Sequence, residues 1–529
     1  MNTNPQKALA SPKRDSGPGA DYRLLVRIAF LISIFAVAFY FRHGAILLYG
    51  DAVAHINIAR RVFDSRTPGI FQLGTVWLAL PHLIDAPFIA NDWMWTTGLG
   101  ASIPSMIAYI AGILGIFRLL RGYASRLTSW IGALLYALNP NLIYMQATAM
   151  TEVLYLAFFI WAVVYLCEFV RDVKVDAERG RKSLERCAMM VSAAMLVRYD
   201  GWFLAAAIAL AAVFIAWRWG WSAPPVRKAI VRFVLLTGLT AGLWLAYNYA
   251  NFYNPLEFAT GPYSTRAIVS ASSMPVYPGK DHPRTAAIYF LKAARLNLSE
   301  GGLEYALLNI AFVTALAALC FSRRHWPALL LWVPVLFYTL SIAWASVPIY
   351  IPQWWPHSYY NVRYGLQMLP AVAVFGALAF EFLAKIMPMR IPGVMILLMA
   401  VASYYMVWQK GPICLREAQA NGSGRMMFEQ HLALELQKLP PGATLMMNCG
   451  AHGGALQNAG IHLRRVLQEG NHPEWTTGLS APARAADYLV VFQGDELSYA
   501  VRAVPQGLQT VAIVETPGYS QATIYRSMH

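Results

Sequence analysis

Acidic residues stand beside long apolar runs in this sequence, at depths where charge is costly and usually functional. Asp51 ends the first apolar run in GDAVAHINIARRVFDS, and His55 lies four residues on, on the same face of the predicted helix. Glu152 opens a later apolar run in TAMTEVLYL. A partly buried carboxylate can act as a general base, so Asp51, Glu152 and His55 are the candidate catalytic residues. The structural alternatives are a cap or helix-dipole role for each acid and a packing role for the histidine.

Basic residues begin or interrupt other apolar runs. Arg363, in HSYYNVRYG, begins a predicted span on the outer side, against the usual bias of basic residues towards the cytoplasm, so an anionic partner is the natural explanation. Arg198 and Asp200 break the run 187–219 and could pair with each other. Arg266 and Tyr263 in GPYSTRAI and Lys280 in YPGKDHPR stand in outer loops, where aromatic residues are often only membrane-interface anchors.

Familiar soluble-enzyme signatures are missing from the sequence. The segment CGAHGGA fits neither a phosphate-binding loop nor a dinucleotide-binding motif, and no HExxH or clustered metal-ligand spacing occurs. The formal charge of +15 is spread between apolar runs and does not form one basic face. We therefore expect a lipid bilayer and no nucleic acid as partner.

Composition places these residues in a membrane protein. The 529 residues are 57% hydrophobic and 13% charged, and apolar runs long enough to cross about 30 Å of hydrocarbon recur from residue 24 to 408. Basic segments, expected inside, are the N-terminal tail, 118–126, 171–186, 218–228, 322–325 and 385–390. The prediction is a polytopic α-helical protein of about 11 spans, with cores near 24–42, 94–117, 127–139, 150–170, 187–198, 202–217, 230–249, 304–321, 327–346, 365–384 and 391–408.

Two of these spans, 127–139 and 187–198, reach only roughly 20 Å at 1.5 Å per residue. The turns that follow them, 139–150 and 198–201, should therefore lie below the membrane surface and form the floor of an outward-facing cavity. Outer segments 49–93, 250–303 and 347–364 would cover it. The first of these should contain two helices in the interface, Ala52 to Asp64 and Val76 to Ile89.

The two ends of the chain differ from the transmembrane domain, 23–410. Residues 1–22 are basic and rich in Pro and Gly, which predicts a disordered cytoplasmic tail. Residues 411–529 alternate helical and strand-like segments, which predicts a small α/β domain outside the membrane. Cys414 and Cys449 both fall outside, where a disulfide could form or both thiols could stay free.

The motifs together resemble the integral-membrane glycosyltransferases of the C type, closest to the relatives of dolichyl-phosphate-mannose protein mannosyltransferases and lipid A aminoarabinose transferases. The shared features are Asp51 after the first span, a first outer loop with interfacial helices, Thr151-Glu152 opening the fourth span, an Arg-Tyr-Asp-Gly turn at 198–201 and Asn-Val-Arg-Tyr-Gly at 361–365. The resemblance covers roughly residues 20 to 410. Relatives often carry a pair of acids in the first loop, whereas Gly50 and Ala52 flank Asp51, so the sequence supports no metal or other cofactor.

This resemblance implies a polyprenyl-phosphate sugar donor, inversion at the anomeric carbon and Asp51 as catalytic base. Cations aimed at the donor phosphate would stabilise the departing phosphate, and four residues are candidates: Arg363, Arg198, Arg266 and Lys280. Substrate contacts are expected from Asp92, Asp200, Tyr263 and Tyr364. The acceptor would be an envelope glycan, lipid or protein, and the location a bacterial inner membrane with the C-terminal domain outside. A transporter or flippase, or a noncatalytic scaffold, is the alternative.

Overall fold

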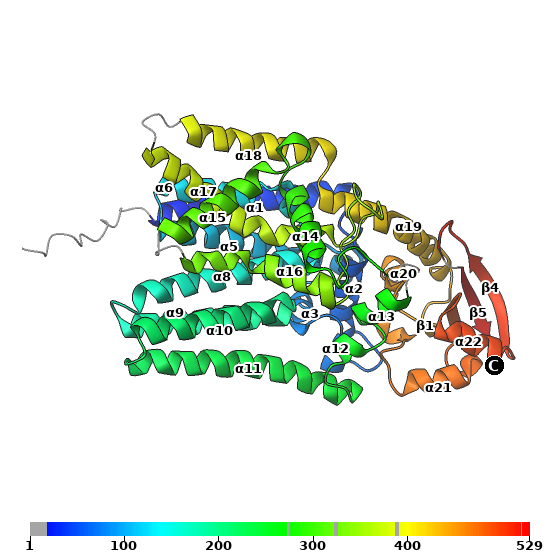
Figure 1. Ribbon diagram of the computed structural model, residues 1–529. Coiled ribbons are helices and arrows are strands. Elements are labelled where there is room, and N and C mark those ends of the chain that lie inside the picture. The colour runs from blue at the N-terminus through cyan, green and yellow to red at the C-terminus, as the bar shows by residue number, and fades with distance from the viewer. Residues whose placement is uncertain (1–17, 272–275, 322–325, 387–390, 520, 529) are drawn as a thin grey trace, which may run out of the picture.

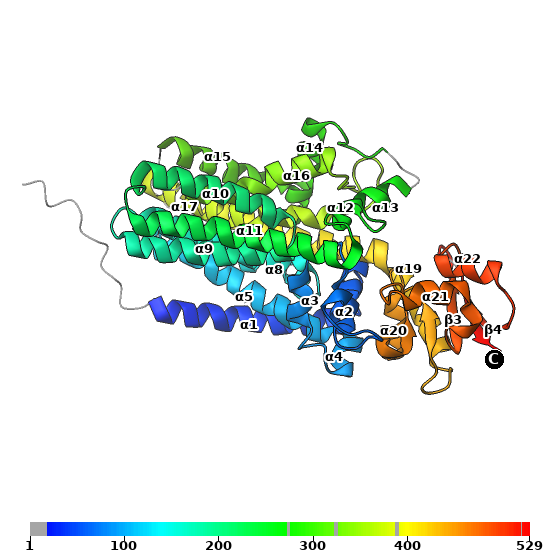
Figure 2. The same cartoon turned by 90° about the horizontal axis from the view of Figure 1, so that it is seen from below.

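The computed structural model describes residues 18–271, 276–321, 326–386, 391–519 and 521–528. Long helices run side by side in a bundle, and a smaller domain with a sheet sits at one end of it (Figures 1 and 2). The long helices are α1 (Pro18–Arg42), α5 (Leu99–Arg121), α6 (Arg126–Ala137), α8 (Thr151–Asp172), α9 (Ala177–Val197), α10 (Asp200–Trp219), α11 (Pro224–Phe252), α15 (Ala306–Phe321), α16 (Val333–Trp344), α17 (Leu369–Ile386), α18 (Ile391–Lys410) and α19 (Ile413–Leu436).

Within the described residues, nine helical stretches are long and apolar enough to cross a membrane. Two predicted spans are not among the nine: α6 has only 12 residues, and α9 begins with a charged half. The structure thus supports a polytopic helical fold, without fixing the number of spans at eleven. The turns from α8 to α9 and from α10 to α11 lie at the end opposite the sheet, as threading by basic segments requires (Figure 1).

Several predicted boundaries move. The first helix begins at Pro18, so part of the predicted tail is helical, while residues 1–17 lie outside the described residues. The second predicted span is divided at Gly98, a left-handed residue with φ 75°, into α4 (Asp92–Thr97) and α5. Helix α9 starts ten residues before its predicted core because Asp176 caps it within the basic segment. The predicted inside segment 322–325 and residues 387–390 of the predicted inside segment 385–390 also lie outside the described residues.

Shorter elements fill the space between the bundle and the small domain (Figure 1). The first outer segment forms α2 (Gly50–Arg61), the 3-10 turn η2 (Ile70–Leu73) and α3 (Ala79–Asp85), which is half the length predicted for 76–89. The second forms α12 (Glu257–Thr260), α13 (Thr265–Ala271), α14 (Pro283–Leu298) and η3 (Gly301–Leu303). Two further 3-10 segments, η4 (Trp326–Trp332) and η5 (Val362–Met368), lead into α16 and α17.

The C-terminal region has the predicted α/β character. Its five strands have the order β2-β1-β3-β5-β4, with β1 parallel to β2 and β3 and with β5 antiparallel to β3 and β4. The strands are β1 (Leu445–Met447), β2 (Val466–Leu467), β3 (Tyr488–Phe492), β4 (Leu508–Val514) and β5 (Ala522–Ser527), and the helices are α20 (Gly453–Ala459), α21 (Glu474–Ser480) and α22 (Glu496–Ala503). Strands β2 and β5 and helices α21 and α22 were not predicted. Cys414 and Cys449 are both free.

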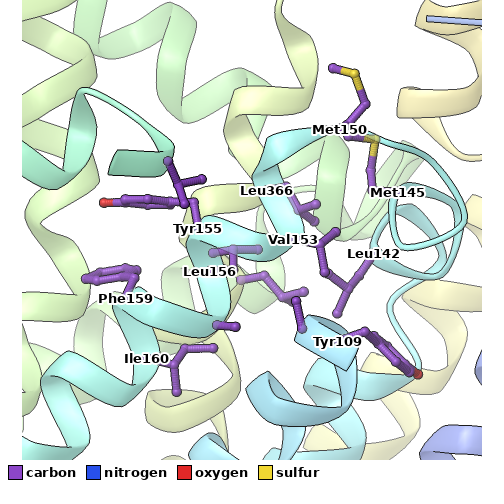
Figure 3. Packing of buried hydrophobic residues seen from close by; sticks show 14 of the residues in the cluster. Tyr109, Leu142, Met145, Met150, Val153, Tyr155, Leu156, Phe159, Ile160 and Leu366 are labelled. Carbon is purple, nitrogen blue, oxygen red and sulfur yellow. The ribbon is translucent and has the colours of Figure 1, made fainter. Parts of the chain in front are cut away.

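The apolar core extends to the outer end of α8. Figure 3 shows Met150, Val153 and Leu156 of this segment packed with Leu142 of α7 (Pro140–Met145) and with Leu366 of η5. These side chains are at most 3% exposed. The turn after α6 is therefore buried, and it supports the start of α8. The outward-facing cavity above it stays a prediction.

Candidate functional site

Six charged residues from five parts of the chain meet at the end of the bundle that faces the C-terminal domain. We call this group the Arg363 cluster; it consists of Asp51 on α2, Glu152 on α8, Arg198 and Asp200 at the turn from α9 to α10, Arg363 on η5 and Glu417 on α19. Four carboxylates thus share two guanidinium groups. Arginine suits this role because its planar group donates in several fixed directions at once.

The backbone around Arg363 is shaped by two residues. Asn361 adopts a left-handed conformation, φ 56°, which asparagine tolerates better than most residues, and its side chain donates to the carbonyl of Pro348. Gly365 follows, and a Cβ there would lie 2.3 Å from the Ala293 carbonyl carbon of α14. The sequence NVRYG therefore lets η5 turn tightly against α14 and fixes the direction of Arg363.

Helix α19 reaches the cluster through another close approach. A Cβ on Gly422 would lie 1.9 Å from the carbonyl oxygen of Leu48, just before α2, so only glycine allows this contact. One and a half turns earlier on α19, both oxygens of Glu417 are used by Arg363: Oε1 accepts from Nη1 at 2.6 Å and Oε2 from the backbone N–H at 3.0 Å. The helix that leads into the C-terminal domain is thereby part of the site.

The guanidinium of Arg363 donates to three carboxylates in different directions. Besides Glu417, Nη2 donates to Asp51 Oδ2 at 2.7 Å and Nε to Glu152 Oε1 at 3.2 Å. Charge-assisted bonds of this kind are the strongest in proteins, and three of them fix one orientation. Arg363 therefore joins α2, α8 and α19 at one point.

Arg198 forms the other half of the cluster. Its Nη1 donates to Glu152 Oε1 at 3.1 Å, its Nε lies 3.3 Å from Asp200 Oδ1, and Tyr338 of α16 donates to Asp200 at 2.6 Å. The proposed Arg198–Asp200 pair is thus present, but it is extended by Glu152. Both guanidinium carbons also lie over the ring of Tyr364, at 4.9 and 5.1 Å from its centre.

The cluster is most open at Asp51, and Arg198 is next with 13% of its side chain exposed. The side chain of Asp51 is 40% exposed, whereas those of Glu152 and Glu417 are fully buried and that of Arg363 is 8% exposed. Asp51 is not the N-cap of α2, because Tyr49 occupies that position and the side chain of Asp51 faces Arg363. The capping interpretation is therefore wrong, and a ligand approaching the cluster would meet Asp51 first.

His55 does not contact Asp51. It is 1% exposed, and its Nδ1 lies 2.9 Å from Nε2 of His82 on α3. Burial lowers the pKa of His55 to about 4, although Asp51 and Glu152 act to raise it. A neutral imidazole that packs α2 against α3 agrees with the structural alternative for His55.

Four other predicted residues lie apart from the cluster. Asp92 pairs with Arg60 at 2.6 Å and is 59% exposed. Tyr263 is 48% exposed and stands near Asn448 and Glu469 of the C-terminal domain, while Arg266 on α13 is exposed. Lys280, also exposed, lines a separate cavity of about 450 Å³ with Tyr277 and Trp355.

Two members of the site were missed by the sequence interpretation. Glu417 lies in GPICLREAQAN, beyond the predicted membrane domain, and nothing in its spacing links it to Arg363. Tyr338 lies within an apolar run, where a tyrosine is usually a packing residue. Among the described residues, no three His, Cys, Asp or Glu side chains are grouped so that they could hold a metal ion.

Comparison with solved structures finds the same fold elsewhere. ArnT from Cupriavidus metallidurans bound to undecaprenyl phosphate matches with a TM-score of 0.57 and 13% identity, over 96% of this chain and 98% of that one. The apo structure of the same protein gives 0.56 and 11%, with the same coverage. An oligosaccharyltransferase from Archaeoglobus fulgidus gives 0.48 and 12%, over 90% of this chain and 70% of that one.

No protein-family profile matches the sequence, and no curated protein does.

Proposed function

Because its fold is that of the C-type integral-membrane glycosyltransferases, we propose that the chain transfers a sugar from a polyprenyl-phosphate donor to an acceptor. The transfer takes place at the face of the membrane that carries the C-terminal domain. The ArnT structure with this fold was solved bound to undecaprenyl phosphate. Nine stretches of the described residues are suited to a bilayer, which is where such a donor resides.

One observation carries the proposal: a half-exposed carboxylate, that of Asp51, is held 2.7 Å from the buried guanidinium of Arg363. A general base and a cation side by side are the two groups that this transfer requires. Asp51 is the most exposed member of the Arg363 cluster, ahead of Arg198 at 13%, so Asp51 marks the place where substrates would enter.

The chemistry follows from these positions. Asp51 takes the proton of an acceptor hydroxyl, and the hydroxyl oxygen bonds to C1 of the sugar as the bond between C1 and the phosphate oxygen breaks. The sugar inverts at C1, and the polyprenyl phosphate leaves with an added negative charge. Arg363 and Arg198 stabilise that charge more in the transition state than before it. No metal or other cofactor enters this scheme.

The cluster also implies an order of events. Arg363 Nη2 is occupied by Asp51, and its other partners are buried, so a donor phosphate gains access to the guanidinium by displacing Asp51. The same displacement frees the carboxylate to accept a proton. Donor binding would in this way activate the base, and an acceptor arriving without donor would meet a carboxylate that is already paired.

The orientation that we propose is a bacterial plasma membrane with the N-terminus in the cytoplasm. It rests on the basic turns at the end of the bundle opposite the sheet domain (Figure 1). A tag inserted after Val175 should be reached from the cytoplasm, and a tag at His529 from outside. Cytoplasmic labelling of the tag at His529 would contradict the proposal.

Sugar transfer is tested on the purified chain. The protein is incubated with a panel of radiolabelled polyprenyl-phosphate sugars and an envelope extract as acceptor, and label is measured in acceptor and in lipid. Label moving to the acceptor, lost in Asp51→Asn, supports a transferase. If the protein moves the lipid donor between leaflets of a vesicle with no label transferred, the chain is a flippase.

A further inference from the structure

A cavity with a basic rim lies far from the Arg363 cluster. It measures about 860 Å³ and is bordered by α5, α8, α10 and α15 near the end opposite the sheet domain. Along α8, Glu152 of the cluster and Glu168 of the cavity are 16 residues apart, which corresponds to roughly 24 Å at 1.5 Å per residue. The cavity is therefore a separate site.

Four cations and one acid border this cavity. The cations are Arg118, Arg171, Lys174 and Arg218, and the acid is Glu168. Arg118 neutralises Glu168, with Nε donating to Oε1 at 2.7 Å and Nη2 to Oε2 at 3.0 Å. Within the described residues Arg218 has no hydrogen-bond or ion-pair partner, and its side chain is exposed. Arg171 pairs with Asp172 at 2.9 Å, so the four cations face two acids, Glu168 and Asp172, and the cavity keeps an excess of positive charge.

The rest of the cavity is suited to hydrocarbon. Phe214 and Leu319 border it and are 52% and 54% exposed, and Trp217 beside them is 70% exposed. Phe214 also packs edge-on against Trp326, whose ring centre is 6.4 Å away. Apolar surface exposed at this level of a membrane bundle faces acyl chains, with aromatic rings at the headgroup level.

We propose that this cavity binds one anionic phospholipid of the leaflet opposite the transfer site, with its phosphate among Arg171, Lys174 and Arg218 and its acyl chains along Phe214 and Leu319. Basic pockets between transmembrane helices select anionic headgroups through charge and select lipids through the adjoining apolar surface. The inference goes beyond the proposed function and does not depend on it. A bound lipid would link α5, α8 and α10 at this end of the bundle.

The test uses the full-length purified protein and native mass spectrometry in detergent. Phosphatidylglycerol and phosphatidylcholine are titrated separately, because they share acyl chains and differ in net charge. We expect tighter binding of phosphatidylglycerol and at least about a tenfold loss of its affinity in Arg171→Gln/Arg218→Gln, since each cation near a headgroup adds a few-fold to affinity. This variant leaves the Arg118–Glu168 pair intact.

Arg227→Gln/Lys228→Gln is the matched control. Both residues are exposed at the start of α11, at the same end of the bundle, and neither borders the cavity. The control also removes two positive charges, but at residues outside the cavity. Phosphatidylglycerol affinity that is unchanged in the control and lowered in the cavity variant supports the site. Equal losses in both variants, or equal affinity for both lipids, overturn the proposal.

Two further arms separate the sources of phosphate. Inorganic phosphate alone at tens of millimolar should not displace the lipid. If it does, the cavity binds a phosphate ion and has no preference for a lipid, which contradicts the proposal. Polyprenyl phosphate replacing phosphatidylglycerol at equal concentration would assign the cavity to the donor and overturn the phospholipid assignment.

Discussion

The two ends of helix α2 each carry a buried ion-pair network built around an arginine. At the N-terminal end Asp51 meets Arg363, whose three partners are all carboxylates. At the C-terminal end Arg60 binds Asp64 and Asp92, donates to the carbonyls of Ile89 and Ala90, and lies 4.7 Å from the ring centre of Trp95. The residue types are the same, but their partners differ.

The partners indicate which network could do chemistry. Arg60 is 3% exposed and uses backbone carbonyls, which cannot accept a proton at ordinary pH, so its network joins a loop to α2. His462 extends it to the C-terminal domain through Asp64. Each network holds one carboxylate that reaches solvent, Asp51 at 40% and Asp92 at 59% exposed. The difference is that Asp51 lies beside two guanidinium groups, since Arg363 and Arg198 share Glu152, and a base next to paired cations is the arrangement expected at a site of transfer. Polar groups that are fully satisfied by fixed partners hold a fold together, and an accessible one can react.

The largest effect should come from Asp51→Asn. Asparagine keeps the size and a hydrogen bond to Arg363 but cannot accept the proton, so sugar transfer should fall by about two to four orders of magnitude. Single-turnover transfer and donor affinity are measured on the same purified variant; donor binding that is retained or tighter, because a neutral amide competes less for Arg363 than the carboxylate does, is the evidence of correct folding. Substantial remaining transfer would exclude Asp51 as base and leave Glu152, the acid shared by Arg198 and Arg363, as the next candidate.

Arg363→Lys should rank second. Lysine keeps the charge but lacks the planar group that donates to three carboxylates at once, and a cation facing developing charge is worth roughly two orders of magnitude or more in turnover. We therefore expect a loss of about a hundredfold with a smaller change in thermal stability. Arg60→Lys serves as the matched control, since it should lower stability while leaving turnover close to that of the wild type. If Arg60→Lys instead lost turnover while Arg363→Lys lost only stability, the Arg60 network would be the site of chemistry and the Arg363 cluster the structural one.

The comparison also separates what the sequence predicts from what it does not. Asp51, Glu152, Arg198 and Arg363 could be selected because each carries charge next to an apolar run, where charge is costly. The number and approximate positions of the apolar runs likewise gave the helical bundle. The predicted helix boundaries were wrong where a capping side chain sets the first residue of a helix. Asp176, for example, caps α9 inside a charged segment.

Residues brought together over long separations could not be predicted. Glu417 is 54 residues from Arg363 and lies in a helix with no membrane signal of its own, and it reaches the cluster because Gly422 allows contact with Leu48. Conversely, Lys280 and Arg266 share their charge and outer position with Arg363, but the fold leaves both exposed. Their role in donor binding stays a prediction that the geometry does not support.

Glu417→Gln should have an intermediate effect. Glutamine can still accept from the Arg363 backbone or guanidinium, but the bond loses its charge, which costs about tenfold in turnover if Arg363 must be held in place. Because Glu417 only positions Arg363, Glu417→Asp should be as impaired through its shorter reach. The measurement is kcat against donor KM; a loss of stability with normal turnover would give Glu417 a purely structural role.

Asp92→Asn should have the smallest effect, although the sequence offers Asp92 as a substrate-binding residue. Its carboxylate is 59% exposed and pairs with Arg60, and an ion pair with one solvent-exposed member adds at most about 1 kcal/mol to stability. Arg60 would keep Asp64 and two carbonyl acceptors, so the network at this end of α2 survives the change. We expect transfer within about fivefold of wild type, because 1 kcal/mol corresponds to about fivefold. Asp64→Asn is the informative partner, since this buried acid also pairs with His462 and its replacement should lower the melting temperature without lowering kcat. A hundredfold loss of transfer in Asp92→Asn with normal stability would place substrate at the C-terminal end of α2 and remove the distinction between the two networks.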